Sequence, residues 1–202
     1  MPEFANPLWL LGIVGLLAYG LGSVPFGVVI ARVMGLGDLR QIGSGNIGAT
    51  NVMRTGNKLA GVLTFLLDAG KGAIAALIAW RLFGEDAAQV AALAAFLGHL
   101  YPVYLGFKGG KGVATFIGTA LALAWPVGLA ICAIWLCVFA LSRYSSLAAL
   151  VATAASPVLV AVFGPDTMVA VFVVLGVMIF FKHSDNIRRL LAGTESRFTR
   201  KG

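Results

Sequence analysis

Long apolar stretches, each close to the length of a membrane-spanning helix, dominate this sequence and restrict its fold more than any other feature. Of its 202 residues, 59% are hydrophobic and 11% are charged, whereas a soluble domain carries roughly 25% charged residues. So few charges cannot cover a surface that faces water, so the surface must face lipid. The sequence therefore predicts an all-α integral membrane protein. Despite the net charge of +7, we expect no nucleic-acid partner.

The number of spans depends on one long stretch, 113–142. A transmembrane helix needs about 20 mostly apolar residues, and this stretch is interrupted at Trp125-Pro126. Because proline often ends a helix, we divide it into spans 113–124 and 126–142. The other predicted spans are 7–31, 59–83, 88–107, 145–164 and 166–181. This makes seven transmembrane helices in one domain, residues 1–202; six is the alternative, if 113–142 is a single kinked helix.

The positions of the basic residues favour seven spans. With seven spans, Lys71 lies within the membrane, Arg81 lies near the outer end of a span, and all other basic residues share one face. These are Arg32, Arg40, Arg54, Lys58, Lys108, Lys111, Arg143, Lys182, Arg188, Arg189, Arg197, Arg200 and Lys201. The outer loops then hold Glu3, Glu85, Asp86 and Asp166. By the positive-inside rule, the N-terminus lies outside and the C-terminus is cytoplasmic.

Two glycine-rich segments on the basic face are suited to binding phosphate. The first runs Gly-Ser-Gly-Asn-Ile-Gly-Ala-Thr-Asn over 43–51 and is followed by Arg54. Its glycines let the backbone turn and point N–H groups at an anion, and an arginine matches phosphate geometry. The second, 107–115, places Lys108, Gly109, Gly110 and Lys111 ahead of a helix N-terminus, which attracts anions. The alternatives are a flexible loop for the first and topology anchors for the two lysines.

Two further polar segments follow on the same face. Ser145 and Ser146 precede a span, where either could simply cap a helix. His183 and Asn186 follow the last span, beside basic residues. A histidine at this place could transfer a proton or help to hold an anion, although it could equally be an ordinary boundary residue.

Three ionisable residues lie inside the predicted spans. Asp68 and Lys71 are one helical turn apart and can pair, and His99 lies on the next span. We favour a structural ion pair with a packing histidine over a proton or ion path. Paired carboxylates and His/Cys ligand spacing are absent from the sequence, so we expect neither a metal nor a cofactor.

Taken together, these motifs resemble the bacterial acyl-phosphate:glycerol-3-phosphate acyltransferase family, PlsY. The resemblance covers residues 20–197 and rests on the segments 43–54, 68–72, 98–102, 109–115, 145–146 and 183–189. One departure is Ile47, where proline is common in the family.

The resemblance implies an inner-membrane enzyme with its active site on the cytoplasmic face. Such an enzyme moves a fatty acyl group from acyl phosphate to the 1-hydroxyl of sn-glycerol 3-phosphate, forming lysophosphatidic acid and phosphate in phospholipid biosynthesis. The partners implied are acyl phosphate, glycerol 3-phosphate and membrane lipid. By the same resemblance the catalytic residues are Ser44, Lys111, His183 and Asn186. The substrate-binding residues that it implies are Asn46, Thr50, Arg54, Ser145 and Ser146. To these we add Lys108, Gly109 and Gly110, because they form the predicted phosphate cradle ahead of the short helix.

A different class of function stays open from the residues alone. A small transporter of an anionic solute would explain ionisable residues within spans. The two classes differ in a simple measurement, because only the enzyme releases phosphate from an acyl phosphate when glycerol 3-phosphate is supplied.

Overall fold

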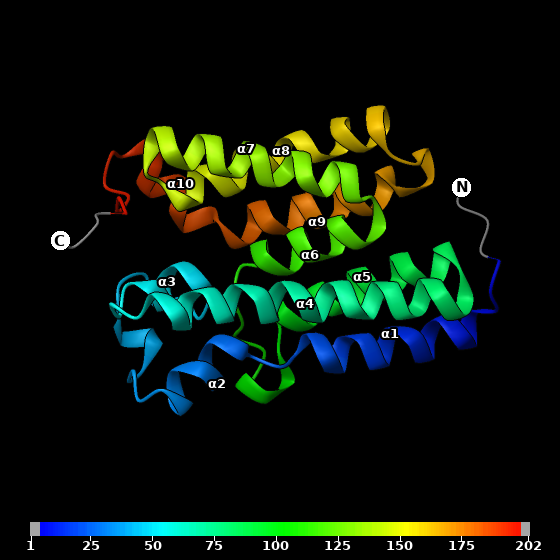
Figure 1. Cartoon of the computed structure of the whole chain (residues 1–202), viewed down its shortest axis with the longest axis horizontal. Helices are drawn as coiled ribbons and strands as arrows, with labels where there is room; N and C mark the ends of the chain where they lie inside the picture. The colour runs from blue at the N-terminus through cyan, green and yellow to red at the C-terminus, as the bar shows by residue number, and fades with distance from the viewer. Residues whose placement is uncertain (1–4, 199–202) are drawn as a thin grey trace. The chain divides into compact units, whose positions relative to one another are not determined.

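The structure is a computed structural model that describes residues 5–198, which are helical apart from turns and loops. Glu3, Arg200 and Lys201 from the charge argument lie outside this range. The described chain divides into two compact units, one up to Leu123 and one from Ala124 onward. Each unit is a bundle of its own, shown in Figure 1 with the first unit in blue to green.

Eight helical segments build the first unit. They are α1 (Leu8–Gly22), α2 (Phe26–Val33), η1 (Leu39–Gln41), α3 (Ala49–Met53), α4 (Lys58–Phe83), α5 (Glu85–Leu100), η2 (Val103–Leu105) and α6 (Val113–Leu123). Helix α5 packs against both α1 and α4, and α6 packs on α4 (Figure 1). Small residues make these contacts close: a methyl group on Gly22 would overlap the backbone of Ala95, and one on Gly118 the backbone of Ala69. Small residues commonly allow helices to approach closely inside membranes.

The second unit contains five helical segments. They are α7 (Trp125–Ser142), α8 (Ser145–Phe163), η3 (Asp166–Met168), α9 (Val169–Lys182) and α10 (Ser184–Leu191). Helix α8 packs against α7 and α9. The chain bends by 62° between the helix that ends at Lys182 and α10, so α10 leaves the direction of the span before it.

The helices of both units expose large apolar side chains, as lipid-facing surfaces do. On α1, the side chains of Leu8, Leu16 and Leu17 are each more than two-thirds exposed. Within the described residues, five helical stretches are long and apolar enough to cross a bilayer: Leu8–Val33, Lys58–Phe83, Glu85–Leu105, Trp125–Ser142 and Ser145–Phe163. Asp166–Lys182 with Ser184–Leu191 forms a sixth if that bent pair is one span. The protein is therefore a multi-pass membrane protein.

The division at Trp125-Pro126 is confirmed, because α6 ends at Leu123 and α7 starts at Trp125. Helix α6 has 11 residues, which corresponds to about 16 Å at 1.5 Å per residue. A typical hydrocarbon core is about 30 Å thick. The prediction of an unusually short helix here is thus correct.

Two details differ from the predicted spans. The first span, 7–31, corresponds to the candidate span Leu8–Val33, but its helix is interrupted, because Pro25 lacks a backbone donor and α1 ends at Gly22 before α2 begins at Phe26. Glu85 and Asp86 are not loop residues but the first turn of α5, where carboxylates favour the positive end of the helix dipole. Asp86 there accepts hydrogen bonds from the amide and side chain of Asn6 at 2.9 and 2.6 Å.

The predicted ion pair within the first unit is confirmed. Lys71 Nζ lies 2.9 Å from Asp68 Oδ1, and both side chains are almost fully buried. Lys71 also donates to the carbonyl oxygen of Val24 at 2.8 Å. Since Val24 lies in the break between α1 and α2, this bond satisfies a backbone group that the interrupted helix leaves exposed to an apolar environment.

Candidate functional site

In the first unit, the loop from Gly43 to Arg54 is organised around one buried amide side chain, Asn51. Its Oδ1 accepts from the amide N–H and the hydroxyl of Ser44 at 3.0 and 3.4 Å. Its Nδ2 donates to the carbonyl oxygens of Leu39 and Asn46 at 2.9 and 2.7 Å. One side chain thus connects both ends of the turn to the preceding segment and fixes the shape of the loop.

The side chains predicted to bind substrate are carried on this fixed turn. Ser44 is exposed and Asn46, Thr50 and Arg54 are half-buried. The Arg54 side chain packs over Gly43, whose backbone has the left-handed φ of 54°. Glycine is favoured there because a Cβ would meet both Asn51 and Arg54.

The second glycine-rich segment folds back onto the end of α5. The amide N–H of Gly109 donates to the carbonyl of Leu100 at 3.2 Å, and that of Gly110 donates to the carbonyl of His99 at 3.1 Å. Lys108 is exposed and Lys111 is half-buried. The first residue of α6 is Val113, so Lys111 lies two residues before a helix whose N-terminal N–H groups favour anions.

The two segments meet through Arg40, which lies in η1. The Arg40 guanidinium donates to the carbonyl oxygen of Lys108. A Cβ built on Gly45 would lie 3.1 Å from the Arg40 carbonyl oxygen, so Arg40 also contacts the first segment and brings Lys108 close to it. The two segments carry three cationic side chains, those of Arg54, Lys108 and Lys111, and such side chains can bind phosphate.

In the second unit, the carboxylate of Glu195 accepts hydrogen bonds from three side chains. Glu195 Oε1 accepts from the Ser146 hydroxyl at 2.8 Å and from Asn186 Nδ2 at 2.7 Å. Its Oε2 accepts from Arg189 Nε at 2.6 Å. This cluster, which we call the Glu195 cluster, joins the start of α8 to α10 and to the chain after it.

The surroundings of Glu195 set its charge. Burial raises the pKa of this carboxyl, but the hydrogen bonds from Asn186, Arg189 and Ser146, together with the charge of Arg189, more than offset it. The net result is a pKa below the ordinary value for glutamate. Glu195 is therefore a carboxylate that accepts hydrogen bonds at neutral pH.

His183 lies at the junction of α9 and α10 and is buried. Its Nδ1 is 2.8 Å from the carbonyl oxygen of Ile179. A carbonyl oxygen only accepts, so Nδ1 carries the proton, and in the neutral imidazole Nε2 is then the nitrogen with the lone pair. Ser145, the first residue of α8, is half-buried and adjoins Ser146 of the Glu195 cluster.

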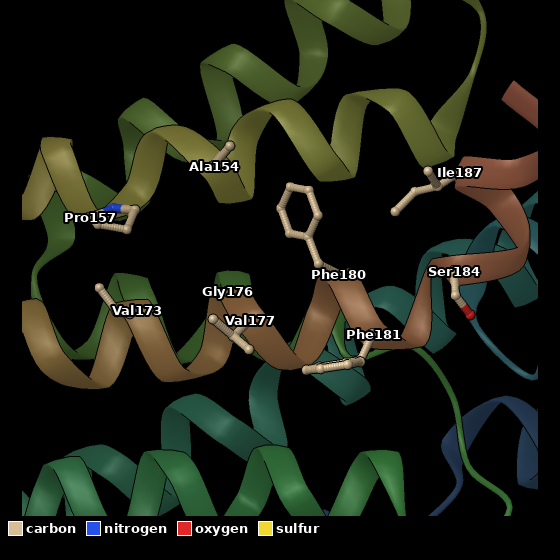
Figure 2. A pocket seen from close by; sticks show the side chains of 9 residues that line it. All are labelled: Ala154, Pro157, Val173, Gly176, Val177, Phe180, Phe181, Ser184 and Ile187. Carbon is tan, nitrogen blue, oxygen red and sulfur yellow. The ribbon is translucent and has the colours of Figure 1, made fainter. Parts of the chain in front are cut away.

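An apolar groove runs along α8 and α9 of the second unit and has a volume of about 530 Å³. Figure 2 shows Phe180 pointing from α9 toward α8, with Pro157 and Val173 at one end and Ser184 and Ile187 at the other. The lining residues are Ala154, Pro157, Val173, Gly176, Val177, Phe180, Phe181, Ser184 and Ile187. Such a lining suits an alkyl chain.

Sequence reasoning did not single out three residues that organise these segments. Asn51 was part of the recognised motif but was not given a role, and Arg40 was counted only as a topology signal. Glu195 had one usable signal, since it is a lone acidic residue between Arg189 and Arg197 in a basic tail. Across residues 5–198, no group of three His, Cys, Asp or Glu side chains is placed to hold a metal ion.

Comparisons with known proteins agree on one family. The family model described as glycerol-3-phosphate acyltransferase matches residues 12–193. A glycerol-3-phosphate acyltransferase of Cereibacter sphaeroides strain ATCC 17025 is 60% identical over 201 residues, which cover all of this chain and 96% of the relative. One from Jannaschia sp. strain CCS1 is 63% identical over 197 residues, 98% of this chain and 97% of the relative.

Two solved structures are also similar, both of PlsY, an integral membrane glycerol 3-phosphate acyltransferase. The glycerol 3-phosphate form has a TM-score of 0.89 and 46% identity, and covers 94% of this chain and 96% of that one. The lysophosphatidic acid form has a TM-score of 0.86 and 44% identity, covering 94% and 95%.

Proposed function

Because this chain belongs to the glycerol-3-phosphate acyltransferase family, we propose that it transfers a fatty acyl group from acyl phosphate to the 1-hydroxyl of sn-glycerol 3-phosphate. The products are lysophosphatidic acid and inorganic phosphate, and the reaction serves phospholipid biosynthesis. The observation that carries this proposal is the Arg40–Lys108 contact, which brings the second glycine-rich, cationic segment to the residues just before the first one. Both substrates carry phosphate, and these segments have the chemistry to hold it.

The reaction needs little covalent assistance from the protein. The 1-hydroxyl oxygen attacks the acyl carbonyl carbon and forms the ester bond, and the bond between that carbon and the phosphate oxygen breaks. Phosphate leaves with the electron pair of that bond, and we assign the hydroxyl proton to a substrate phosphate oxygen. The main barriers are repulsion between two anions and alignment of the hydroxyl with the carbonyl. Stabilisation of the developing oxyanion is the third requirement.

We assign the residues of the first unit to these requirements. Arg54 and Lys108 bind phosphate. The backbone N–H groups of Gly109 and Gly110 donate to the carbonyls of Leu100 and His99, so these two glycines contribute the shape of the bend and not phosphate donors. Lys111 neutralises the charge that develops on the leaving phosphate, and the Ser44 hydroxyl hydrogen-bonds to the reacting group. Asn46 and Thr50 complete the binding set with neutral polar contacts.

In the second unit we assign His183 and Asn186 as catalytic residues and Ser145 and Ser146 as substrate-binding residues. The protonated Nδ1 of His183 fixes the orientation of its ring, and Glu195 orients Asn186. Exchange of His183 for glutamine tests its part. A changed pH profile of kcat would make it the proton acceptor, whereas a modest loss of rate with an unchanged profile makes it a positioning residue.

For the membrane arrangement we propose seven spans, counting the short α6. The N-terminus then lies outside, the C-terminus is cytoplasmic, and the polar segments face the cytoplasm from the inner (plasma) membrane of a bacterium. The distribution of basic residues supports this orientation. The whole chain, 1–202, is proposed to act as one acyltransferase domain without a metal or other cofactor.

The deciding experiment uses the full-length protein purified in detergent and palmitoyl phosphate as the acyl donor. We expect phosphate release that requires glycerol 3-phosphate, with lysophosphatidic acid formed in equal amount. Lys111→Ala should reduce this turnover by at least about 100-fold, as expected for loss of a charge that stabilises the transition state. Uptake of an anionic solute into vesicles, without any such turnover, would instead establish a transporter.

A further inference from the structure

The buried ion pair of the first unit includes a third member, His99. Its Nδ1 lies 3.6 Å from Asp68 Oδ1, the same oxygen that Lys71 Nζ approaches at 2.9 Å. The three side chains are 2–5% exposed. They come from two helices, α4 and α5, so Asp68 connects the two helices electrostatically.

The opposite edge of the His99 ring lies against the second glycine-rich segment. A Cβ built on Gly110 would overlap Nε2 of His99, with Cε1 and Cδ2 as the next nearest atoms. The Gly110 amide also donates to the His99 carbonyl. The imidazole therefore lies directly beneath the bend that precedes Lys111, and Gly110 allows the backbone to rest on it.

The same aspartate is linked to the other end of this segment. The hydroxyl of Thr115, in the first turn of α6, donates to the backbone carbonyl of Asp68 at 2.9 Å, and Thr115 is fully buried. The residues 109–115 are thus held at one end by His99 and at the other by the backbone of α4. Lys71, through its bond to the Val24 carbonyl, holds Asp68 on the side facing the break in the first span.

We propose that Asp68, Lys71 and His99 are positioning residues for the segment 108–112. Asp68, held by Lys71, orients the imidazole of His99, and the imidazole supports the bend at Gly110 so that Lys111, which follows it, faces a bound phosphate group. This inference rests on the proposed role of that segment in binding phosphate.

Packing alone does not require the buried charges of Asp68 and Lys71. An apolar trio of similar volume would fill the space without burying charge, and replacing a buried ion pair in that way is often neutral or stabilising. Charges inside a membrane are costly and usually have a functional role. Here the role of the Asp68–Lys71 pair is to orient the His99 ring. A charge pair can fix the angle of an imidazole, whereas apolar contacts alone leave its rotation less restricted.

The test is a double-mutant cycle between the ring and the glycine. Gly110→Ala adds a methyl group where the ring lies, and no left-handed φ restricts alanine at this position. His99→Ala removes the ring, and the double variant places the methyl in the space left by it. Gly70→Ala is the matched control, because Gly70 lies on α4 between Asp68 and Lys71 with no atom within 4 Å of a built Cβ.

We expect Gly110→Ala to raise the KM of a phosphate-bearing substrate by about 30-fold and His99→Ala by about fivefold. The double variant should also show about a fivefold rise, because contacting residues are not additive. Asp68→Asn, which keeps the shape but removes the charge, should resemble His99→Ala with a smaller change in kcat than in KM. The Gly70→Ala control should match the unmodified protein. Comparing the KM of glycerol 3-phosphate with that of palmitoyl phosphate shows which phosphate the segment binds.

Additive effects in the cycle, or losses confined to kcat and to the melting temperature, would overturn the inference. Lys111→Ala, measured beside these variants, separates this failure from that of the proposed function. A strong loss in Lys111→Ala with an additive cycle rejects only the positioning role. An unaffected Lys111→Ala rejects phosphate chemistry at the segment, and the positioning role with it.

Discussion

The loop of the first unit and the Glu195 cluster of the second unit are each held together by the hydrogen bonds of one side chain, but the two side chains differ in chemistry. Asn51 holds the loop through a neutral amide that both accepts and donates hydrogen bonds. Glu195 holds its cluster through a carboxylate that, when ionised, only accepts. An amide can therefore cross-link backbone N–H and C=O groups, whereas a carboxylate gathers side-chain donors.

This difference gives the two regions different sensitivities. The Asn51 contacts contain no titratable partner, so their strength does not follow pH. The Glu195 cluster includes an ion pair with Arg189, and its strength depends on the protonation of one carboxyl. Charged hydrogen bonds are also stronger than neutral ones. The two regions should therefore respond differently to substitution and to acid.

The largest effect is expected from Glu195→Ala. It removes three hydrogen bonds, one of them an ion pair, and leaves Ser146 and Asn186 without this acceptor. We expect the free energy of unfolding to fall by about 3 kcal/mol, measured as a lower melting temperature in detergent, with most of the turnover lost. Asp185→Asn is the control, since Asp185 lies in α10 beside Asn186 and its 3.6 Å pair with Arg188 is largely exposed. A melting temperature no lower than that of the control would show that Glu195 does not hold this cluster together.

Asn51→Ala comes next. It leaves the Ser44 amide and the carbonyls of Leu39 and Asn46 without these partners in a buried place, and we expect a loss of about 2 kcal/mol. The KM of glycerol 3-phosphate should rise because the loop no longer holds Ser44 and Arg54 in position. An unchanged KM and melting temperature would mean that the loop keeps its shape by other contacts.

Acidification should weaken the Glu195 cluster and leave the Asn51 contacts unchanged. Because the folded pKa of Glu195 lies below its ordinary value, its contribution is present above the unfolded value of about 4.3. It is lost as the pH falls through the folded pKa. The loss should be smaller than in Glu195→Ala, because a protonated carboxyl still accepts from Ser146 and Asn186. Melting temperatures of the protein and of Glu195→Gln from pH 7 to 3 provide the measurement, and the difference between them should narrow in acid. A difference that stays constant contradicts the pKa direction.

The smallest effect is expected from Arg40→Gln. Arg40 is exposed, and its bond to the Lys108 carbonyl is one of several contacts that hold the second segment. We expect the KM of a phosphate-bearing substrate to rise about fivefold, as for loss of one charge-assisted hydrogen bond, with little change in melting temperature. Arg81→Gln serves as the control, because Arg81 lies in the last turn of α4 and belongs to neither glycine-rich segment. If both variants behave alike, the effect arises from net charge and not from the contact.

Much of this architecture could be predicted from the sequence because hydropathy and charge act locally. The length of each apolar stretch and the proline at 126 predicted the helices, including the short α6. The distribution of basic residues predicts that the two segments share one face of the membrane. That face stays a prediction, and the Arg40–Lys108 contact brings the second segment close to the first. These signals need only the residues of one element at a time.

What could not be predicted depends on contacts between distant residues. The partners of Glu195 are up to 49 residues away along the chain, and no periodicity in the tail indicates them. The break at Ser23–Pro25 was missed because mean hydropathy measures the apolar length of a stretch but not the continuity of its hydrogen bonds. Lys71 of α4, 47 residues from Val24 along the chain, donates a hydrogen bond to the Val24 carbonyl at that break.

The anchoring of the segment 109–115 at both ends bears on how a small polar substrate is received. Its bend is formed by hydrogen bonds to α5 and α4 that are made as the chain folds. Glycerol 3-phosphate would then bind to a segment that is already ordered. Its binding would not be weakened by the free-energy cost of ordering a flexible loop. For a compact metabolite with few atoms to contact, such prior order preserves affinity that its few contacts could not otherwise supply.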